Sequence, residues 1–105
     1  MASSVEFKDF VLECLQNCES GFDFKTRKMF GEYCFYILDK RREAKPCFLL
    51  CDDMLFVKAH KELESLLCGN EKAKPFEKAK LWYVLDPENL ELLKQVVQTL
   101  ALIKT

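Results

Sequence analysis

Two apolar runs follow each other in the stretch Cys47-Phe-Leu-Leu-Cys-Asp-Asp-Met-Leu-Phe-Val-Lys58. Their aromatic and β-branched side chains are typical of strands, and Asp52-Asp53 between them predicts a short turn. A connection this short joins antiparallel strands, because a parallel crossover needs a dozen or more residues. The stretch therefore predicts a hairpin with strands at 47–51 and 54–58.

Two further β-rich runs precede this hairpin. They are Thr26-Arg-Lys-Met-Phe30 and Tyr33-Cys-Phe-Tyr-Ile-Leu-Asp39, separated by Gly31-Glu32, which fits a bend or a bulge within pairing strands. The polar residues 39–46 form a loop before the hairpin. The four runs predict an antiparallel meander, and the aromatic run 81–85 adds a fifth strand.

Three segments have helical spacing. Apolar residues recur at 7, 10, 11, 14, 15 and 18, which predicts a helix over about 4–19. Ser3 is its expected N-cap, with Glu6 completing a capping box. Three leucines predict a second helix over 60–68, and Asp86-Pro87 begins a long last helix.

The predicted order is α-β-β-β-β-α-β-α, which indicates an α+β fold. We expect two layers, an antiparallel sheet of about five strands with the helices packed on one side. A chain of 105 residues suits one domain, so residues 1–105 should form a single unit. No apolar run approaches the roughly 18–20 residues that cross a bilayer. The acidic N-terminal segment is unlike a signal peptide, so we expect a cytoplasmic protein.

Cysteine is the unusual part of the composition, with 6 residues. Reduced thiols are expected in the absence of a secretion signal. Cys14-x3-Cys18 and Cys47-x3-Cys51 approach the spacing of zinc ligands. However, the first pair fits the apolar stripe of a helix and the second one face of a strand. Because a free Cys packs as a small hydrophobe, we expect core positions and no metal or other cofactor.

Few residues offer catalytic chemistry. His60 is the only histidine and could act as a base beside a cysteine nucleophile, but its place at a predicted helix start favours an exposed structural role. Asp52-Asp53 could bind a metal, yet adjacent acids are common turn formers. Only 3 glycines occur, so no phosphate-binding loop is expected. We therefore expect no enzyme, and a cysteine-based redox or metal-dependent enzyme ranks third among the hypotheses.

The charge is unevenly distributed. Residues 1–24 contain one basic and five acidic side chains, whereas residues 25–80 contain thirteen basic and nine acidic ones. The candidate binding residues flank the first two predicted strands: Arg27, Lys28, Lys40, Arg41, Arg42 and Lys45.

A second basic group precedes the fifth predicted strand. Lysines at 72, 74, 78 and 80 lie near Phe76 and Trp82, and aromatic rings beside cations can stack on nucleobases. Direct DNA binding through the basic loops is therefore the second hypothesis. The net charge of −1 gives no general attraction to nucleic acid.

Several segments together resemble the TfoX N-terminal domain family. Arg27-Lys-Met-Phe-Gly-Glu-Tyr-Cys-Phe-Tyr36 is similar to its opening signature, and the hairpin at 48–58 is similar to its hairpin. Pro75-Phe76 and Trp82-Tyr-Val-Leu-Asp-Pro87 resemble its later loop, aromatic strand and last-helix entry. The resemblance covers about residues 22–103. The signature residues are Met29, Phe30, Gly31, Tyr33, Lys58, Trp82 and Tyr83.

The resemblance implies a two-layer α+β domain with a role in transcription regulation and natural competence. Full-length family members carry a second, C-terminal domain, and we expect this chain to be a stand-alone N-terminal-type domain. Leu92 and Leu102 widen the apolar face of the last helix, which favours a protein partner or a homodimer. The first hypothesis is a non-enzymatic regulatory or protein-interaction module, with Arg27 as an expected contact residue.

Overall fold

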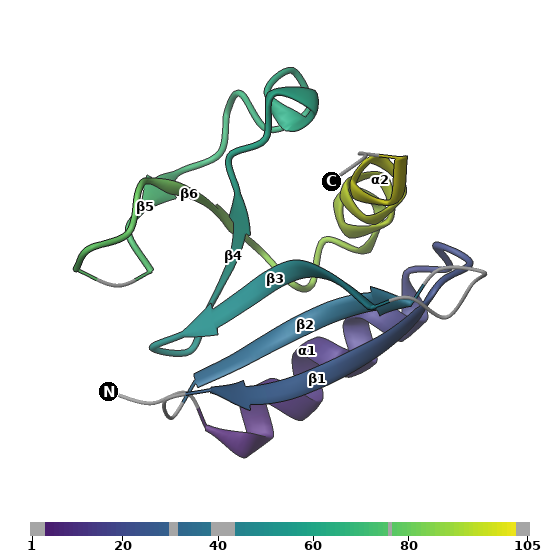
Figure 1. Ribbon diagram of the computed structural model, residues 1–105. Coiled ribbons are helices and arrows are strands. Elements are labelled where there is room, and N and C mark those ends of the chain that lie inside the picture. The colour runs from purple at the N-terminus through teal and green to yellow at the C-terminus, as the bar shows by residue number, and fades with distance from the viewer. Residues whose placement is uncertain (1–3, 30–31, 39–43, 76, 103–105) are drawn as a thin grey trace.

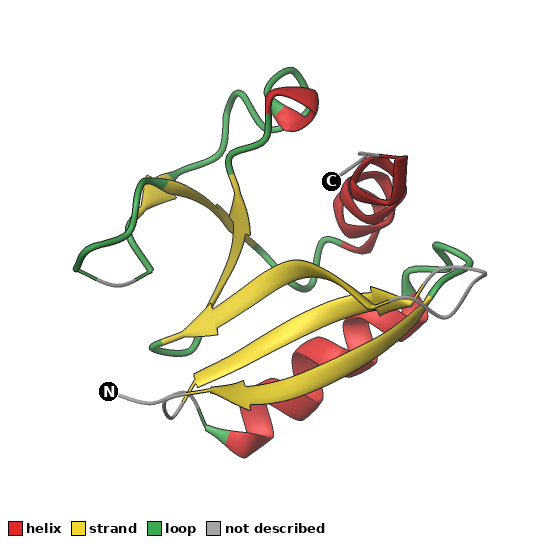
Figure 2. Ribbon diagram, in the orientation of Figure 1, coloured by secondary structure: helices red, strands yellow, loops and turns green. Residues whose placement is uncertain are grey.

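The computed structural model describes residues 4–29, 32–38, 44–75 and 77–102. These parts form one six-stranded sheet of order β1-β2-β3-β4-β6-β5, in which all neighbouring strands are antiparallel (Figure 2). The predicted α+β fold is confirmed. The elements are α1 (Val5–Asn17), β1 (Asp23–Met29), β2 (Glu32–Leu38), β3 (Ala44–Cys51), β4 (Met54–Lys58), the 3-10 helix η1 (Lys61–Leu63), β5 (Lys72–Ala73), β6 (Trp82–Leu85) and α2 (Leu90–Leu102).

The core lies between the helices and one face of the sheet. In β2, Tyr33, Phe35 and Ile37 are buried, and the residues between them are only half-buried. This alternation follows from the two-residue period of a strand. Buried residues of α1 and α2 join the same cluster, among them Leu15 and Leu93. Figure 1 shows α1 running along β1 and β2, and α2 near η1.

Strand β4 is buried on both faces. Leu55 and Val57 belong to the core cluster, and Phe56 between them is also only 2% exposed. Since successive side chains of a strand point to opposite faces, Phe56 is buried on the side away from that cluster. The central part of the sheet therefore tolerates little change on either face.

The turn between β3 and β4 has the backbone that a two-residue hairpin requires. Asp52 and Asp53 have φ angles of 51° and 55°, and Asp is among the few side chains that adopt this left-handed region. The Asp53 Oδ1 atom accepts a hydrogen bond from the Ser4 backbone N–H at 2.8 Å. The Asp52 backbone N–H donates to Glu32 Oε2 at 3.0 Å. The two acids therefore serve the turn and its neighbours.

The first helix begins one residue later than predicted. Ser4 is the N-cap, and its Oγ accepts a hydrogen bond from the Phe7 backbone N–H at 3.1 Å. The prediction of Ser3 as the cap is wrong, because both serines fit the cap position and the apolar spacing alone does not choose between them. Ser3 itself lies outside the described residues.

The segment predicted as a middle helix is a single 3-10 turn. After η1 the chain continues in turns, and a short strand, β5, pairs with β6 in the segment expected to be a loop. Leu63 and Leu67 are nevertheless buried. A short helix is costly to nucleate, and here two leucines reach the core without one.

Within the described residues, no helix is long and apolar enough to cross a membrane. All six thiols are free. Four of them are buried, Cys34 is half-buried and Cys68 is exposed.

Candidate functional site

A bulge in β3 lies beside a cleft in the described surface. In the ladder between β2 and β3, Phe35 pairs with Phe48, and Tyr36 pairs with Pro46. Cys47 is therefore an extra residue in β3. Bulges bend a strand and raise its twist. Pro has no N–H to donate to a ladder, so within sheets it is found at bulges and edges, where the ladder is interrupted.

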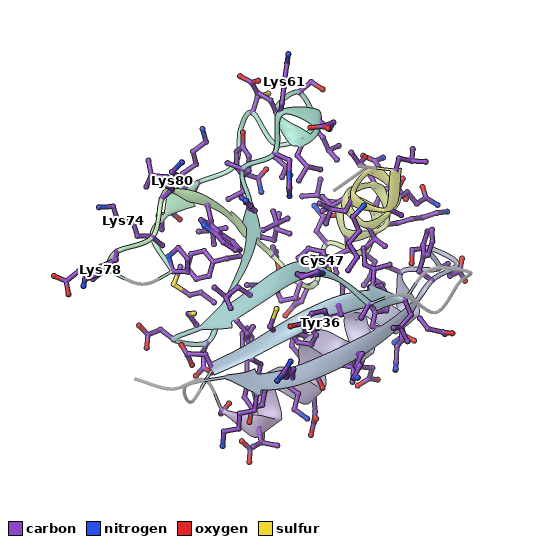
Figure 3. The ribbon with its side chains drawn as sticks, in the orientation of Figure 1. Tyr36, Cys47, Lys61, Lys74, Lys78 and Lys80 are labelled. Atoms are coloured by element: carbon purple, nitrogen blue, oxygen red, sulfur yellow. The ribbon has the colours of Figure 1, made fainter. Side chains whose placement is uncertain are left out.

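The bend separates β3 from β4. Their pairing ends at Phe48 and Val57, and Figure 1 shows β3 curving away from β4. Figure 3 shows Cys47 on β3 beside Tyr36 on β2. The next residues, Cys47 and Lys58, therefore border an opening instead of continuing the ladder.

This opening has a volume of about 340 Å³, and we call it the β3–β4 cleft. Side chains from β2, β3, β4, β6 and α2 contribute, together with His60. Most of its lining residues are apolar, and we call these the floor; we call the three basic lining residues, Lys45, Lys58 and His60, the rim. The lining residues are Cys34, Lys45, Pro46, Cys47, Phe48, Leu49, Lys58, His60, Trp82 and Leu100.

Register places Lys58 and Trp82 together. They are partners across the ladder between β4 and β6, so their side chains lie on the same face of the sheet. Trp82 is the only tryptophan of the chain and is half-buried. An aromatic ring and an ammonium group thus share one wall of the cleft.

Positive charge gathers around His60. Burial lowers the pKa of its imidazole, and the charges of Lys58 and Lys45 lower it further, while Glu62 acts in the opposite direction. Burial is the main cause of the shift, and the contributions of Lys58 and Lys45 show that both lysines lie close enough to His60 to act on its charge.

The two thiols of the cleft are held in their neutral form. Cys47 Sγ donates a hydrogen bond to the Phe35 carbonyl at 3.2 Å, and burial raises the pKa of this thiol well above its ordinary value. Burial also raises the pKa of Cys34, opposed by a hydrogen bond with Tyr36. Nucleophilic cysteines need a lowered pKa, so the arrangement of His60 beside these thiols does not favour a thiolate–imidazolium pair.

The structure describes three of the six predicted binding residues, and one of these three lines the cleft. Arg27 and Lys28 are exposed on β1, and Arg27 pairs with the cleft residue Cys34 across the sheet without lining the cleft itself. Lys45 lines the cleft. The remaining three predicted residues, Lys40, Arg41 and Arg42, lie outside the described residues.

The signature residues have different environments. Tyr33 and Tyr83 are buried, with Lys8 Nζ 5.7 Å and Lys72 Nζ 5.0 Å from the centroids of their respective rings. Met29 ends β1. Phe30 and Gly31 lie outside the described residues. Among the described members of this set, only Lys58 and Trp82 line the cleft.

Sequence reasoning missed several cleft residues. Cys47 was expected to pack in the core, with a zinc site as the alternative, and His60 to start a helix, with a role as a base as the alternative; neither was predicted to line a cleft. The signal that could have indicated the cleft is Pro46 directly before the apolar run 47–51, because Pro in a sheet is confined to the start, an edge or a bulge of a strand. Leu100 offered no such signal, because its position depends on how α2 packs.

Two other candidate sites are a second basic surface and a metal site. Lys74, Lys78 and Lys80 are exposed on one side of the molecule, away from Lys61 (Figure 3). Phe76, expected among them, lies outside the described residues. In the described parts of the chain, no group of three His, Cys, Asp or Glu side chains could hold a metal ion.

Comparisons of the chain with protein-family models, with curated proteins and with solved structures found no match. The resemblance to the TfoX N-terminal domain therefore remains a prediction from the sequence.

Proposed function

We propose that this chain is a non-enzymatic protein-interaction module with a regulatory role, and that the β3–β4 cleft holds a segment of its partner. One observation carries the proposal. Lys45, Lys58 and His60 line an opening whose remaining walls are mostly apolar. A concave apolar surface with a few convergent polar groups is the usual form of a binding site.

The chemistry of the cleft supports binding over catalysis. The thiols of Cys34 and Cys47 have raised pKa values, and the imidazole of His60 has a lowered one. These directions favour neutral groups, whereas covalent catalysis by cysteine requires a thiolate. The TfoX resemblance adds the expectation of a role in transcription regulation and competence.

Direct DNA binding is the second candidate, and a separate observation favours it. Lys74, Lys78 and Lys80 are exposed in the segment that leads into Trp82, where phosphate contacts and base stacking could occur side by side.

Affinity capture with matched charge reversals tests the proposal. The purified tagged chain is incubated with an extract of its own cells under reducing conditions, with and without nuclease. The two variants are Lys58→Glu at the cleft and Lys78→Glu on the basic segment. The proposal predicts a protein partner that survives nuclease, is retained by Lys78→Glu and is lost with Lys58→Glu.

Two outcomes would count against the proposal. Capture that disappears with nuclease, falls with rising salt and depends on Lys78 would favour DNA binding. Equal capture by the wild type and Lys58→Glu would remove the cleft from the interaction.

A further inference from the structure

We infer that the β3–β4 cleft receives a peptide segment in which a carboxylate lies next to a large apolar side chain. The inference rests on the proposed function, because it names the chemistry of the partner segment. It follows from the combination of basic and apolar residues that line one small site.

The rim supplies the complement of a carboxylate. Lys58 ends β4, His60 follows two residues later, and Lys45 comes from β3. The positive charges of both lysines reach the imidazole of His60, where they add to burial in lowering its pKa. Hydrogen bonds from cationic groups to a carboxylate are stronger than those between neutral groups.

The floor supplies the complement of one apolar side chain. Phe48, Leu49, Trp82 and Leu100 line it, and the volume of about 340 Å³ lies near the lower end of the roughly 300–1,000 Å³ found for ligand sites. A site of this size takes one large side chain and its neighbour, not a long segment.

A nucleobase fits this lining less well. Its edge carries several polar atoms, and burying them without hydrogen-bond partners is costly. Most of the lining residues are apolar, and Lys45, Lys58 and His60 are the basic ones among them, so few groups could pair with the polar edge of a base. The observations thus favour an acidic–apolar peptide segment.

The single tryptophan makes the site directly measurable. Because Trp82 is the only tryptophan and lines the cleft, its fluorescence reports binding there without a label. The probe is the peptide acetyl-Ser-Glu-Leu-Ser-amide, titrated to about 10 mM, since a ligand of this size should have a Kd on the order of 1 mM.

Two control peptides separate the contributions. Replacing the probe's Glu by Gln removes the charge and should weaken binding about fivefold at low salt. Replacing its Leu by Ala removes most of the apolar contact and should weaken binding about tenfold. The full chain carrying Lys58→Gln should lose the preference for Glu over Gln, whereas Lys78→Gln should retain it.

The affinity of the β3–β4 cleft for the peptide should also rise as the pH falls. A bound carboxylate favours the charged imidazole, so it raises the pKa of His60, and by linkage the peptide binds more tightly as the pH falls through that pKa. The charged and titratable groups that face His60 are Lys58, Lys45 and Glu62, together with the thiols of Cys34 and Cys47 lining the same cleft. The His60→Gln variant should bind with an affinity that changes little between about pH 8 and about pH 6.

Several results would overturn the inference. The first is no fluorescence change up to the highest peptide concentration, and the second is equal binding of the Glu and Gln peptides. The third is that free hexanoate, or a dinucleotide, binds more tightly than the peptide. If the peptide fails while capture of the protein partner still depends on Lys58, the proposed function stands and only the segment's chemistry is wrong. If the peptide binds but no partner depends on Lys58, the proposed function fails instead.

Discussion

The cleft lies next to a one-residue shift at Cys47. The β3–β4 ladder ends at Phe48 and Val57, directly beside the bulge, and Cys47 and Lys58 line the opening. Cys47 is the extra residue, and its thiol donates a hydrogen bond to the Phe35 carbonyl. A single position thus couples the local backbone to the shape of the candidate site.

His60 should make the folded state less stable in acid. Burial, followed by the charges of Lys58 and Lys45, lowers its pKa from the ordinary value of 6.5. The unfolded chain therefore binds the proton more readily, and this contribution to stability is present above pH 6.5 and is lost as the pH falls toward the folded-state pKa.

The measurement is urea unfolding of the wild type and of His60→Gln at about pH 7.5 and about pH 5.5, which bracket an ordinary histidine pKa. We expect the wild type to lose more unfolding free energy on acidification than the variant, because other titrating groups contribute to both alike. An equal loss would mean that His60 is not held in a positive, partly buried environment.

The six cysteines should differ in reactivity. Cys68 is exposed. Burial raises the pKa of Cys47, and burial together with a hydrogen bond to Glu32 raises the pKa of Cys51 to about 12. Because the thiolate is the reactive form, iodoacetamide at neutral pH should label Cys68 first and Cys47 and Cys51 last.

Mass spectrometry of the digested protein checks this order. The urea-unfolded chain is the control and should show similar rates at all six positions. Labelling of Cys47 as fast as that of Cys68 in the folded protein would contradict the burial of the Cys47 side chain.

At the scale of elements, the sequence pattern predicts the helices and strands that are determined by interactions between residues close together in the chain. The hairpin at 47–58 was predictable because apolar runs flank a two-residue turn, and the last helix because its 3.6-residue period is long. The 60–68 segment has the same kind of pattern but only a few residues, so tertiary contacts of Leu63 and Leu67 override it. β5 has 2 residues and too little pattern to be recognised.

The N-cap of α1 offers a test at this scale. Ser4→Ala removes the acceptor for the Phe7 backbone N–H and should lower the free energy of unfolding by about 1 kcal/mol. Ser4→Gly, the matched control, should cost only about a few tenths of a kcal/mol, because Gly is well tolerated at this position. Thermal or urea unfolding measures both. A larger loss from Ser3→Ala than from Ser4→Ala would contradict the assigned cap.

At the scale of the whole molecule, the cleft arises only after the chain has folded. Its lining extends from Cys34 to Leu100 and comes from five regular elements and the residue His60. The sequence singled out Lys45 as a basic binding residue and Lys58 and Trp82 as signature residues, but no sequence period reports that α2 brings Leu100 to the bulged end of β3. The α+β fold was therefore predictable, whereas most of the candidate site was not.

Site-specific photo-crosslinking tests the central claim most directly. A benzophenone amino acid is placed at Ala59, an exposed residue between the cleft residues Lys58 and His60, or at Lys28, which is also exposed but lies on β1 and does not line the cleft. Each variant is irradiated in an extract of its own cells, and the crosslinked chains are identified by mass spectrometry. We predict a crosslink to a protein partner from position 59 and none from position 28. A partner that crosslinks from position 28 alone would place the interface on the sheet edge and contradict the β3–β4 cleft as the binding site.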